Sequence, residues 1–194
     1  MTERCFRMRS SFVKVGNKRR PAALFLTLIF VLLFLSGCNL TGPGDPVPED
    51  RINDAPENVA RVYAEAVFTG NYLLMFKCYP REFITKFGED DLQKSAAWGR
   101  QISDALLLNA IDFHGTKAKT NEIKNDDQSS IYQDTLRGIE EKASINSKDV
   151  EKIYQCEVNL YFDRDGEDKY QTVSVIVYSY DDAWYVYQME AINL

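Results

Sequence analysis

Hydrophobic and polar positions recur with two different periods along most of this chain. In several segments between residues 54 and 108, and again at about residues 127–144, apolar positions are spaced three and four apart, as on one face of an α-helix. From residue 154 onward they alternate with polar positions, as in a β-strand with one buried face. The pattern predicts a helical part followed by a part made of strands.

Four helices are expected in the first part. The clearest begins at Asp54, which forms a capping-box pattern with Glu57, and it ends before Gly70. Its apolar stripe is formed by Val59, Val62, Tyr63, Ala66 and Val67. The other three helices are expected at about residues 71–79, 91–108 and 127–144, the last with Gly138 inside it.

Three strands are expected in the second part, rich in β-branched and aromatic residues. They read "YQCEVNLYF", "KYQTVSVIVYSY" and "AWYVYQME", and the turns between them read "DRDGED" and "DD". Short turns of this kind join antiparallel neighbours. The expected fold class is α+β, with N-terminal helices packed on one face of a curved antiparallel sheet.

The first 38 residues have a different character. Seven Lys and Arg residues lie before an uncharged stretch at residues 21–35, which ends in Ser36, Gly37 and Cys38. The apolar stretch is shorter than the about 20 residues that span a bilayer, and it has the length of a signal-peptide core. We expect an export signal that is removed; the alternative is an uncleaved membrane helix with an incidental cysteine.

The four residues "LSGC" that end at Cys38 resemble the lipobox of bacterial lipoproteins. The resemblance implies cleavage between Gly37 and Cys38 and a diacylglycerol on the Cys38 thiol. Two acyl chains anchor a protein stably where one is marginal. The expected localisation is therefore extracytoplasmic, anchored to the bacterial cell membrane, or to the outer membrane if there are two membranes.

Removal of residues 1–37 leaves an acidic chain. Those residues hold 7 of the 23 basic side chains and 1 of the 29 acidic ones, so the remainder carries 16 against 28, a net charge of about −12. Nucleic acid is a poor partner for such a surface. Residues 38–53 are predicted to be the lipidated cysteine and a flexible, Gly- and Pro-rich tether, and residues 54–194 a single domain.

The segments "PENVARVYAEAVFTGNYLLMF" and "YDDAWYVYQM" look like those of small lipoproteins with the nuclear transport factor 2-like, or cystatin-like, cone fold. The resemblance implies a cavity between the helices and the concave face of the sheet. Proteins of this fold include enzymes and many non-catalytic binding modules, so the fold alone does not decide the function. The leading hypothesis is a lipid-anchored, non-enzymatic binding or interaction module of the cell envelope. The partner would be an unknown envelope protein or a small ligand, and no cofactor is expected.

One pair of residues favours an enzyme instead. Asp112 and His114 in "IDFHG" stand two apart, so in a strand they would share one face as an orienting group and a base do. No nucleophile is marked nearby, so catalysis is the alternative and not the leading hypothesis. Asp163, Asp165 and Asp168 lack the spacing of an EF-hand, and a hairpin turn rather than a metal site is expected there.

The candidate pocket residues lie on one strand. Tyr170, Thr172, Ile176 and Tyr178 share a face by alternation and would line a pocket if that face points inward. The pattern does not tell inward from outward.

Two cysteines remain in the mature chain, Cys78 and Cys156. In an exported protein they could form a disulfide, which would stabilise the fold by about 4 kcal/mol in the chain-entropy model. The alternative is two buried free thiols.

Overall fold

The computed structural model describes residues 42–125 and 130–191. The described residues belong to one compact unit, Gly42–Leu194. The predicted signal peptide, the cleavage site at Gly37 and the lipidation site at Cys38 lie outside the described residues. Within the described part of the chain, no helix has both the length and the hydropathy needed to cross a bilayer.

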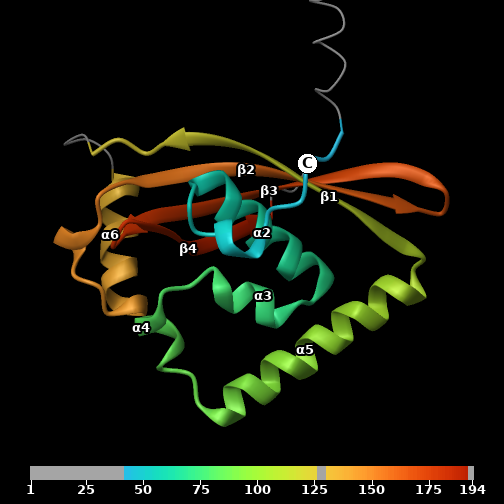
Figure 1. Ribbon diagram of the computed structural model, residues 1–194, viewed down its shortest axis with the longest axis horizontal. Coiled ribbons are helices and arrows are strands. Elements are labelled where there is room, and N and C mark those ends of the chain that lie inside the picture. The colour runs from blue at the N-terminus through green and yellow to red at the C-terminus, as the bar shows by residue number, and fades with distance from the viewer. Residues whose placement is uncertain (1–41, 126–129, 192–194) are drawn as a thin grey trace, which may run out of the picture. The chain divides into compact units, whose positions relative to one another are not determined.

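The strands form one antiparallel sheet with the order β1-β2-β3-β4 (Figure 1). The three predicted strands and both turns are confirmed, whereas the first strand of the sheet, Ile111–Glu122, was not predicted. Asp165–Gly166 joins β2 to β3 and Asp181–Asp182 joins β3 to β4, and all four residues have positive φ, as two-residue type I′ hairpins require. The strands are β1 (Ile111–Glu122), β2 (Ile153–Arg164), β3 (Glu167–Tyr180) and β4 (Ala183–Ala191).

The four predicted helices are also confirmed. Two short 3₁₀ segments and one helical turn, α4, were not predicted. The helical elements are η1 (Glu49–Arg51), α2 (Pro56–Thr69), α3 (Tyr72–Lys77), α4 (Arg81–Ile84), α5 (Glu89–Leu108), α6 (Ser130–Ala143) and η2 (Ser147–Asp149).

One helix boundary differs from the prediction. The residue that caps α2 is Ala55, and it makes no side-chain capping bond, so the capping box predicted for Asp54 and Glu57 is wrong. Pro56 occupies the first turn, where a missing N–H costs nothing. The other end is as predicted, because Gly70 adopts the left-handed conformation with φ 74° that terminates the helix.

The two faces of the sheet carry separate hydrophobic cores. In the larger core, Val59 and Val62 of α2 belong to the same cluster as Val158 of β2 and Val175 of β3. In the smaller core, Ile139 of α6 clusters with Tyr178 of β3. Because successive strand residues point to opposite faces, Val175 and Tyr178 lie on different sides of the sheet. We expected all the helices to pack on one face of the sheet. This expectation is wrong for α6, which covers the opposite face.

The segment that we predicted to be a flexible tether is packed against the domain from residue 42 onward. We call residues 42–53 the strap. The amide of Gly44 donates to the carbonyl of Thr116 at 2.9 Å, and Ile52 is only 1% exposed in the larger core. Asn53 and Trp184 exchange two hydrogen bonds of 2.7 and 2.9 Å. These contacts correct the prediction of a flexible tether for residues 42–53.

Candidate functional site

An open apolar groove of about 440 Å³ lies where α5 passes α2, α3 and the end of β4. We call it the α5 groove. Trp98 of α5 and Met189 of β4 contribute the large apolar side chains on opposite walls. Its volume falls within the range of about 300 to 1,000 Å³ that is usual for ligand sites. The lining residues are Tyr63, Val67, Met75, Lys94, Ser95, Trp98 and Met189.

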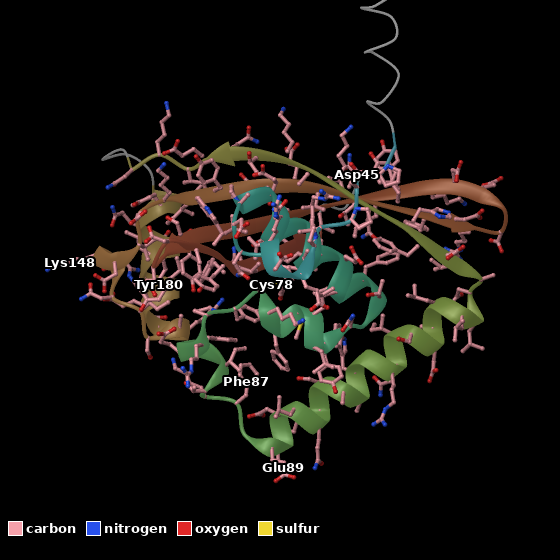
Figure 2. The ribbon with its side chains drawn as sticks, viewed as in Figure 1. Asp45, Cys78, Phe87, Glu89, Lys148 and Tyr180 are labelled. Atoms are coloured by element: carbon pink, nitrogen blue, oxygen red, sulfur yellow. The ribbon has the colours of Figure 1, made fainter. Side chains whose placement is uncertain are left out.

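The groove is open because α5 is held to the domain along only part of its length. The helix has 20 residues, and Gly99 is its one buried residue. Figure 2 shows Glu89, at the start of α5, far from the sheet. Gly99 contacts Gly70 at the end of α2, and a Cβ on either glycine would overlap with the backbone of the other. The two helices meet backbone to backbone at this glycine pair, and Ser95 and Trp98, which line the groove, lie on α5 just before it.

Tyr63, which lines the groove, is paired with Tyr79. The hydroxyls of Tyr63 and Tyr79 are 2.6 Å apart, and their rings meet edge to face with centroids 5.5 Å apart. Burial raises the pKa of both tyrosines. Both hydroxyls are therefore neutral at physiological pH, and the pair adds polar atoms without adding charge to the groove.

A second, smaller cavity of about 190 Å³ lies between α4, α6 and the last two strands. Phe83 of α4, Ile139 of α6 and Tyr178 of β3 are among its lining residues. Tyr79 lines the second cavity and Tyr63 lines the α5 groove. The hydrogen-bonded Tyr63–Tyr79 pair therefore lies between the two. Lys142 places its ammonium 4.4 Å from the centre of the Tyr187 ring at the rim.

Of the four predicted pocket residues, one lines the second cavity and none lines the α5 groove. Tyr178 is 2% exposed and lines the second cavity. Ile176 packs in the smaller core, Thr172 donates a hydrogen bond to Asn159 at 2.7 Å, and Tyr170 is 61% exposed. The four residues are on the face that α6 covers at one end, whereas the α5 groove opens toward the opposite face.

The predicted catalytic pair lies on β1, at the surface. Asp112 and His114 are both exposed, and within the described residues no hydrogen bond joins them. The β1–β2 register shifts between Phe113 and Gly115, so His114 is the extra residue of a β-bulge. The side chains that the fold brings to His114 are Asp163 and Asp168, not Asp112. Spacing along one strand could not reveal this, because it contains no information on cross-strand register.

Cys78 and Cys156 are free thiols, both buried in the larger core. Figure 2 shows Cys78 near the middle of the fold. Its thiol donates to the Leu74 carbonyl at 3.6 Å, and that of Cys156 donates to the Pro56 carbonyl at 3.7 Å. Burial raises the pKa of each thiol from 9.0 to about 12, so neither is a reactive thiolate at neutral pH.

Comparison of the chain with protein-family models, with curated proteins and with solved structures finds no significant match.

Proposed function

We propose that this protein is a lipid-anchored, extracytoplasmic binding module of the bacterial envelope, and that the α5 groove is its binding surface. The single observation that carries the binding role is the groove itself: about 440 Å³, lined mainly by apolar side chains and left open by a long helix with one buried residue. Ligand sites are typically concave, lined mostly by apolar side chains and supplied with a few polar groups, as this groove is.

The anchor rests on the order of basic front, short apolar core and "LSGC" sequence that ends at Cys38. The packing of the strap limits how far the domain could lie from the membrane. Three residues lie between Cys38 and Gly42, and the four Cα-to-Cα steps that join them span at most about 14 Å. A lipid on Cys38 would hold Gly42 close to the bilayer surface, because residues 42–53 are packed on the domain and add no slack.

The ligand class follows from the lining of the groove. Met75 and Met189 are adaptable side chains that fit apolar groups of varied shape. Trp98 offers a large flat surface, and Lys94 at the rim is the one cation among the lining residues. We infer an amphipathic ligand with an apolar body and an anionic or polar end, either a small molecule or a segment of an envelope protein.

We also propose the finer fold assignment, a nuclear transport factor 2-like cone. It is supported by helices α2–α5, which precede a curved antiparallel sheet, and by a groove between those helices and the last strand of the sheet.

The alternative, an envelope enzyme that uses Asp112 and His114, has less support. The two residues are exposed and not joined to each other, and neither lines the α5 groove or the second cavity. If the alternative were correct, Asp112→Ala would reproduce the phenotype of cells that lack the protein while the circular dichroism spectrum stayed unchanged. The binding proposal predicts that cells with this substitution behave like the parent; Asp112 is the member of the pair that lies outside the His114 cluster.

Binding can be tested with anilinonaphthalene sulfonate, a fluorescent probe with an apolar body and one negative charge. Both cores are made of residues from the compact unit Gly42–Leu194, so a soluble chain of residues 39–194 keeps them. We expect saturable binding that weakens at least about tenfold in Trp98→Ala, which corresponds to about 1.4 kcal/mol.

Two further variants make this test specific. Ser95→Trp fills the groove and should also abolish probe binding, whereas Tyr170→Ala removes an exposed aromatic side chain elsewhere and should leave it unchanged. Equal probe binding by the parent, Trp98→Ala and Ser95→Trp chains would overturn the proposal that this groove binds ligands.

A further inference from the structure

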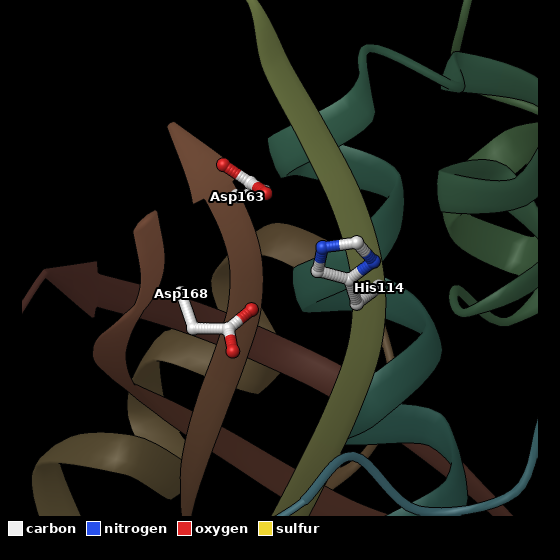
Figure 3. A group of neighbouring side chains, drawn as sticks. All are labelled: His114, Asp163 and Asp168. Carbon is white, nitrogen blue, oxygen red and sulfur yellow. The ribbon is translucent and has the colours of Figure 1, made fainter. Parts of the chain in front are cut away.

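A histidine and two aspartates from three neighbouring strands converge at the hairpin end of the sheet. His114 comes from β1, Asp163 from β2 and Asp168 from β3, and one ligand atom of each lies within 4.8 Å of the other two. Figure 3 shows the imidazole of His114 directed toward the two carboxylates. Two ligand atoms on a tetrahedral zinc ion are about 3.4 Å apart, so small side-chain rotations suffice to close the set around one ion.

The β-bulge in β1 is what presents the histidine. Phe113 pairs with Phe162 and Gly115 pairs with Tyr161, which leaves His114 without an opposite residue. Bulges of this kind re-aim a side chain. Gly115 has φ 136°, a conformation that a residue with a Cβ rarely adopts, and Pro43 of the strap packs where that Cβ would be. The backbone is therefore built to hold the bulge in place.

The two carboxylates face each other without a compensating cation from the protein. Asp163 and Asp168 are directly opposite in the β2–β3 register, an arrangement that destabilises a sheet when both residues carry the same charge. The neighbouring cations pair elsewhere: Arg164 with Asp165 at 3.7 Å and Lys169 with Glu167 at 3.2 Å. Among the described residues, neither Asp163 nor Asp168 has an ion-pair partner.

We propose that His114, Asp163 and Asp168 form a binding site for a divalent transition-metal ion, with zinc as the best match. One imidazole and two carboxylates are a donor set that suits zinc, whereas calcium and magnesium prefer oxygen ligands alone. Three protein ligands leave a fourth position open to water. The ion would neutralise the opposed carboxylates and crosslink β1 to the β2–β3 hairpin. This site does not depend on the proposed function, because none of its residues lines the α5 groove.

The lone histidine makes the test direct. His114 is the one histidine in the 194 residues, so a ¹⁵N-labelled full chain purified in detergent without a histidine tag gives a single set of imidazole signals. Titration with zinc chloride alone should shift the imidazole nitrogen signals to a saturated position. The cysteines do not confuse this readout, since it reports on the imidazole only.

Variants of the carboxylates identify the other ligands. Asp163→Asn and Asp168→Asn should each weaken zinc binding, as read from the imidazole signals, at least about tenfold, since even loss of an outer partner typically costs 10- to 100-fold. Asp165→Asn is the matched control: it lies in the same turn, pairs with Arg164 and lies outside the cluster, so zinc binding should not change. Imidazole signals that do not move with excess zinc, or equal affinity in parent, Asp163→Asn and Asp168→Asn chains, would overturn the proposal.

Discussion

Gly99 on α5 and Gly70 at the end of α2 meet backbone to backbone: a Cβ on either residue would overlap with the carbonyl oxygen of the other. This contact joins the C-terminal end of α2 to the middle of α5, next to Trp98 of the α5 groove. A glycine inside a helix normally costs about 1 kcal/mol relative to alanine. The close approach of the two backbones explains why glycine occupies position 99, because any side chain there would overlap with Gly70.

Gly99→Ala should therefore destabilise the domain although alanine favours helices. The overlap forces α5 away from α2, and we expect a net loss of about 1–3 kcal/mol in the free energy of unfolding, as for other overpacked sites. Urea unfolding followed by circular dichroism measures it. Gly42→Ala is the control, because no atom lies within 4 Å of the position that its new methyl group would take, and its stability should not change. A more stable Gly99→Ala chain would show that the contact is not tight.

The strap should contribute to stability as part of the fold. Ile52 is 1% exposed, so Ile52→Ala removes a buried side chain and should cost about 2–5 kcal/mol. Ile131→Ala makes the same chemical change at a position 60% exposed and should cost less than about 0.5 kcal/mol. Equal unfolding midpoints in urea for the two variants would mean that the strap does not pack as described.

Thiol counting should distinguish the two states of Cys78 and Cys156. In a full chain with Cys5→Ser and Cys38→Ser, we expect no thiol to react with Ellman's reagent in the folded state, because both thiols are buried and neutral. After unfolding in urea without reductant, two thiols should react. If none reacts after unfolding, the cysteines form a disulfide and the free-thiol assignment is wrong.

The buried thiols also set a pH dependence of stability. Burial raises the pKa of Cys78 and Cys156 to about 12 from 9.0, so above pH 9 the folded chain binds more protons than the unfolded chain. Their contribution to the free energy of unfolding is fully present below pH 9 and is lost as the pH rises toward 12. Urea midpoints should fall between pH 8 and pH 10.

A double variant attributes this effect to the thiols. In Cys78→Ala/Cys156→Ala the decline between pH 8 and pH 10 should be smaller, because the two groups no longer titrate. The same decline in parent and double variant would assign the pH dependence to other groups, such as the buried Tyr79, whose pKa is also raised.

Much of the fold could be predicted from local patterns. Alternation identified β2, β3 and β4, and the pairs Asp165–Gly166 and Asp181–Asp182 identified the hairpins, because these signals depend on neighbours in the sequence. The presence of Gly138 inside α6 had no local explanation. The structure supplies one: the ring and hydroxyl of Tyr187 occupy the space where a side chain would be.

What could not be predicted depends on contacts between distant residues. The strap is rich in Gly and Pro and has no apolar period, yet Ile52 reaches the core and Asn53 pairs with Trp184, 131 positions away. His114 was paired with Asp112 by spacing, whereas the cross-strand register brings it to Asp163 and Asp168. The α5 groove likewise lies beside a contact between two distant glycines, which no periodicity encodes.

Mass spectrometry of the protein extracted from membranes of cells that produce the natural sequence tests the central claim most directly. If the protein is a lipid-anchored envelope module, its N-terminal residue is Cys38 and carries the mass of a diacylglycerol. Cys38→Ser should leave an unprocessed precursor without acyl mass, whereas Cys5→Ser, a cysteine in the segment to be removed, should be processed normally. A protein of natural sequence that begins at Met1 and carries no acyl mass would contradict the account.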